Sequence, residues 1–219
     1  MSSDIAGHVY MQTNEVNNSI MHFGRDAEGR LELLESVPTG GTGSSTFKPI
    51  SGQESAPNAF EGAGSVILAE SNTLLFATNG GDNSVTSFRV GSDGKLTMID
   101  RQSTGELVAG RTGTAKSLAY RAQSRTLYVL HAFGPNHLRS FTVAEQGNLT
   151  LRPEQYSVNT STKADRVPTQ VVLSPDGHFL LIDILFDARP AANADGSPNL
   201  VVANAPDPDG LVIFPVRDD

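Results

Sequence analysis

Short runs of alternating apolar and polar residues, separated by turns rich in Gly, Asn and Asp, follow one another along the chain. The clearest is SVTSFRV at residues 84–90, which lies between the turns NGGDN and GSDG. A period of two is typical of a strand with one buried face, and β-branched and aromatic residues favour that conformation. No segment carries a convincing apolar period of 3.6 over the length of a helix. The pattern predicts an all-β protein.

The strands group into units of up to four. The best-defined unit is expected to have strands at residues 64–69, 74–78, 84–90 and 96–103. The next unit has its counterparts at residues 115–120, 127–131, 138–143 and 149–155. The first unit begins with a strand at 8–12, and the last has strands at 170–173, 179–185 and 211–216. The units therefore differ mainly in how many strands they contain.

The units share one sequence template. Residues 79–96, NGGDNSVTSFRVGSDGKL, match residues 14–31, NEVNNSIMHFGRDAEGRL, which lie 65 positions earlier. Residues 132–149, AFGPNHLRSFTVAEQGNL, follow the same template 53 positions later. A shorter copy near the C-terminus is DPDGLVIFPV; the phenylalanine common to all four copies is Phe23, Phe88, Phe141 and Phe214. Variable spacing between constant units is typical of a repeat protein with insertions in its surface loops.

Four-stranded antiparallel units in series indicate the blades of a β-propeller. A β-sandwich or open barrel with coincidental hairpins is the alternative; the propeller is favoured because three units share one template. We expect a single β-propeller domain over residues 1–219, with blades at about 7–39, 63–105, 114–158 and 167–219. The first unit lacks its innermost strand and the last its outermost, so about three and a half blades are present.

A propeller typically needs four to eight blades to close, and an open arc exposes two strand edges. We therefore expect a second half of the propeller to complete the ring, as part of a longer protein. The alternative is a second copy of this chain, because two copies hold the strands of seven four-stranded blades. On either interpretation the chain alone is not expected to be a stable soluble monomer.

Composition narrows the classes of partner. The 219 residues are 38% hydrophobic and carry a net charge of −8, which argues against a nucleic-acid surface. The absence of cysteine excludes disulfides and thiolate chemistry, and the acidic turns lack the residue series of a calcium loop. No apolar run approaches the ~20 residues of a membrane span, and MSSDIAGHVY is not a signal peptide. We expect no metal, organic cofactor or membrane partner, and favour the cytoplasm.

Two segments resemble a known family: LLFATNGGDNSVTSFRVGSDGKLTMI at residues 74–99 and VPTQVVLSPDGHFLLIDILFD at residues 167–187. They resemble the lactonase-type seven-bladed β-propellers, which include the propeller 6-phosphogluconolactonases and the carboxymuconate cyclases. Nearly the whole chain aligns with the first half of that family. The resemblance implies a cofactor-free lactonase or cycloisomerase, which hydrolyses or forms the lactone of a sugar acid or of a muconate-type carboxylate.

The second segment departs from the family pattern H-P-H-Q, because residues 167–170 read V-P-T-Q. Neither Val nor Thr transfers a proton near neutral pH, whereas His does. Asp183 and Asp187 keep the D-x-x-x-D spacing of the pattern, but its arginine is displaced by one position to Arg189. The alternative function is therefore a non-catalytic propeller, a binding or assembly scaffold that lost the family histidines.

Strand ends and loops near the expected channel supply the candidates for chemistry. His131 ends a strand, and Asp183 is a carboxylate within the apolar run LLIDILF; we predict both as catalytic acid–base groups. The alternative for Asp183 is a structural carboxylate, because a buried Asp needs hydrogen bonds. The residues predicted to bind a carboxylate or phosphate of the substrate are Arg111, Lys116, Arg139, Arg166, Gln170, Asp187 and Arg189.

Overall fold

A computed structural model of the chain describes residues 5–43, 63–105, 114–164, 166–186 and 210–217. These residues form four antiparallel sheets of three or four strands, and the one helical element among them is the short 3-10 turn η1 (Ala122–Ser124). The predicted all-β fold of partial propeller blades is confirmed. The assignment of all 219 residues to one domain stays a prediction, since parts of the chain between and after the sheets lie outside the described residues.

The sheets follow the order of the chain. The first contains β1 (Gly7–Gln12), β2 (Ser19–Arg25) and β3 (Leu31–Pro38), and the second β4 (Val66–Ala69), β5 (Leu74–Asn79), β6 (Ser84–Val90) and β7 (Leu96–Ser103). The third contains β8 (Ala115–Arg121), β9 (Thr126–His131), β10 (Leu138–Val143) and β11 (Leu149–Tyr156). The fourth contains β12 (Val167–Leu173), β13 (Phe179–Phe186) and β14 (Leu211–Pro215).

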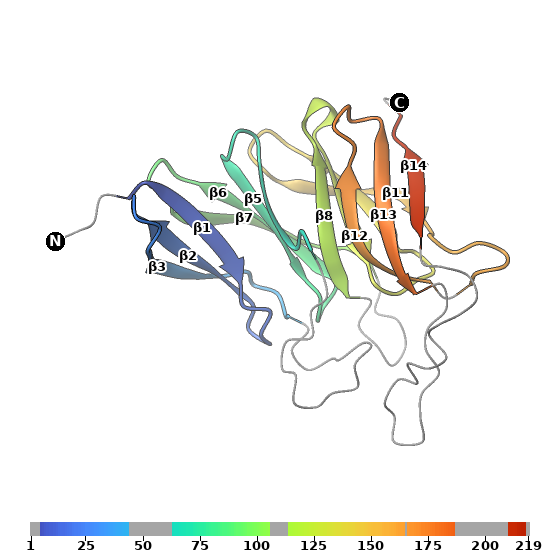
Figure 1. The fold of residues 1–219 in the computed structure, drawn as a ribbon, viewed down its shortest axis with the longest axis horizontal. Helices are drawn as coiled ribbons and strands as arrows, with labels where there is room; N and C mark the ends of the chain where they lie inside the picture. Colours follow the sequence, from blue (N-terminus) through green and yellow to red (C-terminus); the bar gives the residue numbers. More distant parts are fainter. Residues whose placement is uncertain (1–4, 44–62, 106–113, 165, 187–209, 218–219) are drawn as a thin grey trace, which may run out of the picture.

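Figure 1 shows the four sheets packed side by side in chain order, with the face of each sheet turned toward the next. Three apolar clusters fill the spaces between them. Ile20 of the first sheet packs with Leu75 and Phe88 of the second; the other two clusters join the second sheet to the third and the third to the fourth. Each large apolar side chain buried there contributes ~1.5–3 kcal/mol to stability.

The middle sheets are buried on both faces, and this explains their sequences. In β5, Leu74 and Phe76 belong to the cluster shared with the third sheet, whereas Leu75 and Ala77 belong to the cluster shared with the first. All six residues of β5 are buried. A strand covered on both faces has a continuous apolar run rather than an alternating one, and LLFA is such a run.

The glycine of the template closes the hairpin before each outermost strand. Gly29, Gly94 and Gly147 have φ values of +85°, +77° and +97°. Each donates its N–H to the carbonyl three residues earlier, at 3.1, 2.9 and 2.9 Å respectively. A tight turn followed by a left-handed residue is a common hairpin connection, and glycine adopts that conformation without steric cost. The repeat is thus present in the backbone as well as in the sequence.

A carboxylate links the outer strands of adjacent sheets. Oε1 of Glu35 on β3 accepts a hydrogen bond of 2.8 Å from the backbone N–H of Leu96 on β7. Oδ2 of Asp100 on β7 accepts one of 2.9 Å from the N–H of Leu149 on β11. The two acids lie 65 positions apart and the two leucines 53, as the template requires. Hydrogen bonds to a charged acceptor are stronger than neutral ones, so they fix how the sheets stack.

A threonine that follows each outer strand makes a second link. Thr39 donates its backbone N–H to the carbonyl of Asn18 at 2.9 Å, and its hydroxyl lies 2.7 Å from Oδ1 of Asn79 in the next sheet. Thr104 donates its N–H to the carbonyl of Asn83 at 2.7 Å, and its hydroxyl likewise reaches the next sheet. These threonines are fully buried. The chain is therefore held in place where it leaves one sheet for the next.

The outer faces of the two end sheets remain uncovered in this chain. On the first sheet Met11 is 53% exposed and Leu33 50%; on the last, Ile213 is 55% exposed and Leu211 63%. In the middle sheets the corresponding faces are covered by a neighbour. Clustered apolar exposure of this kind marks an interaction surface.

We predict that the isolated chain self-associates. The uncovered apolar faces favour contact with a second copy, because burial of apolar surface stabilises association. Light scattering after size exclusion should give a mass above the 23.2 kDa of one chain. Met11→Glu together with Ile213→Glu should lower that mass, whereas a stable monomer of the unmodified chain would contradict the prediction.

We also predict that Gly94→Ala destabilises the protein more than Gly29→Ala. Both glycines have positive φ, but a Cβ on Gly94 would lie 2.4 Å from Nδ1 of His8, whereas a Cβ on Gly29 meets nothing within 4 Å. Backbone strain from the positive φ should cost ~1 kcal/mol in both variants, so the difference between them reports the clash of the new Cβ with His8. Urea unfolding should show a larger loss for Gly94→Ala, and equal losses would contradict the described contact with His8.

Candidate functional site

Most of the predicted site residues that the structure describes lie toward one edge of the third and fourth sheets. β8 begins beside the end of β9, where Ala115 pairs with His131, and β12 begins beside the end of β13, where Val167 pairs with Phe186. This polar edge, as we call it, is the lower edge in Figure 1, where the arrows of β1 and β13 end. Arg111, Asp187 and Arg189, which were also predicted, lie outside the described residues.

His131 is buried, with 3% of its surface exposed. Its Nδ1 lies 3.1 Å from the carbonyl of His137, and its Nε2 lies 2.7 Å from the hydroxyl of Thr104. Because a carbonyl only accepts, Nδ1 carries the proton and Nε2 accepts from the threonine. Burial lowers the pKa of His131 to about 4, so the ring is neutral at pH 7. His131 thus joins the second and third sheets through Thr104, as Asn79 joins the first and second through Thr39.

His137 precedes β10 at the same edge. It is 1% exposed, and its Nδ1 accepts a hydrogen bond of 3.4 Å from the N–H of Val158. Burial lowers its pKa to about 4. Its Nε2 is buried with no hydrogen-bond partner among the described residues. His137 is therefore a second neutral imidazole, and its Nε2–H is a hydrogen-bond donor without a partner among the described residues.

Asp183 and Gln170 face each other on adjacent strands, β13 and β12. Both are half-buried. The hydroxyl of Thr169 donates a hydrogen bond to Oδ2 of Asp183. Ile182 and Ile184, on either side of Asp183, pack toward the third sheet, so the carboxylate lies on the opposite, uncovered face of the last sheet. The structure brings this predicted pair together, and no described contact joins Asp183 to His131.

The predicted cations at this edge differ in their surroundings. Arg166 donates from Nη1 to the carbonyl of Val158 at 2.9 Å, which anchors the entry to β12. Lys116, near the start of β8, is 1% exposed, and its side chain or backbone already has a partner in the protein. Arg139 on β10 is 8% exposed, and burial lowers its pKa. The predicted catalytic and binding roles of all these residues stay predictions.

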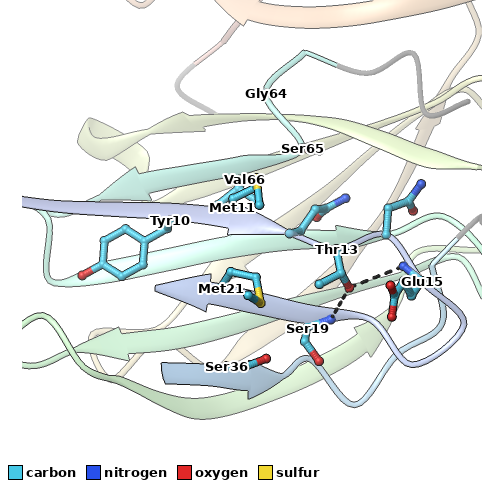
Figure 2. A pocket seen from close by; sticks show the side chains of 12 residues that line it. Tyr10, Met11, Thr13, Glu15, Ser19, Met21, Ser36, Gly64, Ser65 and Val66 are labelled. Atoms are coloured by element: carbon cyan, nitrogen blue, oxygen red, sulfur yellow. Dashed lines mark hydrogen bonds between the residues drawn. The ribbon is translucent and has the colours of Figure 1, made fainter. Parts of the chain in front are cut away.

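A groove of about 800 Å³ runs along β1 and was not foreseen from the sequence. Figure 2 shows it between β1 and the segment Gly64–Val66, with Met11 and Met21 on its floor and Thr13 and Ser19 at one end. The side-chain amide of Gln12, which lines the groove, is buried with no partner among the described residues. In the four-stranded sheets, β4 and β8 flank the strands that correspond to β1. The groove therefore lies where the first sheet lacks a fourth strand.

The described residues contain no group of three or more His, Asp or Glu side chains arranged to hold a metal ion. Among the same residues, no helix is long and apolar enough to cross a membrane.

The sequence family described as "Lactonase, 7-bladed beta-propeller" matches residues 4–112. The resemblance to the lactonase-type seven-bladed propellers is confirmed. No curated protein matches this chain. A solved candidate 6-phosphogluconolactonase from Bacteroides uniformis is 16% identical with a TM-score of 0.54, over 97% of this chain and 64% of that one. A protein from Lactobacillus plantarum is 16% identical with a TM-score of 0.55, over 100% of this chain and 55% of that one.

A second candidate 6-phosphogluconolactonase, from Bacteroides fragilis, is 15% identical with a TM-score of 0.50, over 89% of this chain and 52% of that one. The chain thus spans between about half and two thirds of the length of these three structures. At such identities the likeness shows the propeller fold alone.

The buried histidines predict a pH-dependent stability. The pKa of His131 and of His137 is about 4 in the folded protein against 6.5 ordinarily, so the unfolded chain binds more protons between these values. The free energy of unfolding should therefore be highest above pH 6.5 and fall toward pH 4, by up to ~1.4 kcal/mol per pH unit for each histidine.

His131→Asn tests this, because Asn79 occupies the same place in the preceding interface. We expect the variant to fold and to show a shallower loss of stability between pH 6.5 and 4 in urea unfolding. A slope identical to that of the unmodified protein would contradict the buried neutral state of His131.

Proposed function

We propose that this chain forms part of a lactonase-type propeller that hydrolyses, or in reverse forms, the lactone of a sugar acid or of a muconate-type carboxylate. The observation that carries the proposal is the match of residues 4–112 to the seven-bladed lactonase family. The pairing of Asp183 with Gln170 at the polar edge supports it, because a carboxylate beside an amide supplies a proton acceptor and a hydrogen-bond donor.

In this mechanism Asp183 accepts a proton from a water molecule as the water oxygen bonds to the lactone carbonyl carbon. The Gln170 amide donates a hydrogen bond to the substrate, and Thr169 orients the carboxylate through Oδ2. When the tetrahedral intermediate collapses, the ring C–O bond breaks and the leaving alkoxide takes up a proton. Cations at the polar edge, Lys116 and Arg166, hold the anionic group of the substrate.

The ring needs completion for such a site to be enclosed. A second half of the propeller, or a second copy of this chain, would cover the outer face of the last sheet, on which Asp183 and Gln170 lie. Covering that face would exclude water from the carboxylate and strengthen its electrostatic interactions.

The second candidate is a non-catalytic propeller that serves in binding or assembly. One observation favours it: Val167 and Thr169 stand where the lactonase-type pattern has histidines, Val167 is fully buried, and Thr169 is bonded to Asp183. His131, the histidine predicted to be catalytic, has both ring nitrogens engaged in hydrogen bonds. On this interpretation the polar edge organises the fold and binds no reacting group.

Turnover of glucono-δ-lactone, 6-phosphogluconolactone and muconolactone tests the proposal. We expect hydrolysis of at least one lactone, and a fall in kcat of about 100-fold in Asp183→Asn, because removal of a general base costs 10²–10⁴-fold. Asp93→Asn is the matched control, since Asp93 is an exposed carboxylate in a hairpin turn, and its kcat should be unchanged.

Folded protein that turns over none of the lactones, in its completed assembly, would favour the scaffold. His131→Asn in the same assay distinguishes a catalytic role of His131 from a structural one. A loss of turnover at unchanged stability would support the predicted catalytic role. Full turnover would mean that His131 serves only to bond Thr104 across the interface.

A further inference from the structure

The two interfaces between sheets have the same polar positions, filled differently. In the first interface, Nδ2 of Asn79 lies 3.0 Å from both the Ser84 and Thr86 hydroxyls, and the Thr86 hydroxyl donates to the carbonyl of Thr39 at 2.9 Å. The Thr39 hydroxyl completes the network on Oδ1 of Asn79. Every member is neutral, buried and hydrogen-bonded. The members of this network therefore leave no hydrogen-bonding group free for a ligand.

Register identifies the corresponding residues in the second interface. Asn79 ends β5 and His131 ends β9. Two residues before them, Ala77 pairs with Thr86 on β6, and Val129 pairs with Arg139 on β10. Arg139 therefore takes the place of Thr86. The first interface has the small hydroxyl of Thr86 at this position, and the second has the long, positively charged side chain of Arg139.

The side chain of Arg139 faces the second sheet. Phe141, two residues further along β10 and hence on the same face, packs with Phe76 and Val85 of that sheet. At the end of β7, Gly105 lies against the guanidinium: a Cβ on Gly105 would be 3.2 Å from Nη1 of Arg139. The guanidinium thus lies between the end of β7 and β10, in the neighbourhood of the neutral ring of His131.

Arg139 has no hydrogen-bond or ion-pair partner among the described residues, and its Nε is buried and unsatisfied. The other buried arginine, Arg121, also has one unsatisfied nitrogen, Nη1, but it donates from Nε to the carbonyl of Gly177 and from Nη2 to Gln123. Arg125 forms an ion pair of 2.8 Å with Glu70. A largely buried charge without a partner is costly, because desolvation disfavours it. Nε2 of His137, at the same end of β10, is a second unsatisfied donor.

We propose that Arg139 forms the floor of an anion-binding recess between the β4–β7 and β8–β11 sheets, which takes the carboxylate or phosphate of a small organic acid. A guanidinium binds such groups through two parallel hydrogen bonds, and Nε with one Nη supplies that fork. The neutral rim formed by Thr104, Gly105 and His131 leaves one positive charge to be balanced by one anion. That this anion belongs to a lactone substrate rests on the proposed function; the binding itself does not.

Titration of inorganic phosphate and of D-gluconate into ¹⁵N-labelled protein, at constant ionic strength set with chloride, tests the recess. The Arg139 Nε–H resonance should shift saturably with at least one of the two anions, and comparison of their dissociation constants tells a phosphate site from a carboxylate site. Arg139→Thr, which restores the residue of the first interface, should fold and weaken binding by about tenfold or more. Arg89→Gln is the matched control, because Arg89 donates only to the carbonyl of Gln146 on the surface.

An Arg139 Nε–H resonance that neither anion moves would overturn the inference, and so would equal weakening by Arg89→Gln and Arg139→Thr. No step of this experiment requires turnover. Saturable anion binding without lactone hydrolysis would support the anion site and contradict the proposed activity. If neither anion moves the Arg139 resonance and Arg139→Thr still hydrolyses a lactone, the activity would be supported and the anion site contradicted.

Discussion

The hydrogen bonds at the points where the chain passes from one sheet to the next fix the rest of the structure. Apolar packing alone is non-directional, so two sheets that meet through leucines and phenylalanines could slide over one another. Thr39 and Thr104 fix the crossing at one end, and Glu35 and Asp100 fix the outer strands in the middle. The angle and offset between sheets then follow from four side chains that recur at the spacing of the repeat.

The strands were largely predictable because their signal is local. Residues 84–90, 96–103 and 138–143 begin and end where the alternation and the turn residues place them. β12 begins at Val167 rather than at the expected residue 170; the sheet accommodates Pro168 at a shift of register, where a proline is tolerated. The template also aligned Gly29, Gly94 and Gly147, and all three have positive φ in the structure.

The surroundings of the candidate residues were not predictable in the same way. Whether His131 is an exposed acid–base group or a buried link depends on Thr104, which belongs to another sheet. The same applies to Arg139, whose guanidinium lies against Gly105, at the edge of another sheet. These contacts follow only from aligning one interface with the next residue by residue. The paired residues Ala77 and Thr86 are nine positions apart, whereas Val129 and Arg139 are ten apart, and this difference hides the correspondence in the sequence. Asp183 was found because a carboxylate in an apolar run is visible without tertiary information.

The uncovered faces of the two end sheets have a consequence for motion. A row of units in which each touches only its neighbours behaves as a one-dimensional array, whose local stability depends on how many neighbours a unit has. The β1–β3 and β12–β14 sheets have one neighbour each, and the middle sheets have two. Backbone amides should therefore exchange with solvent fastest at both ends of the chain and slowest in β5 and β9, so that the protein opens from its ends toward its centre.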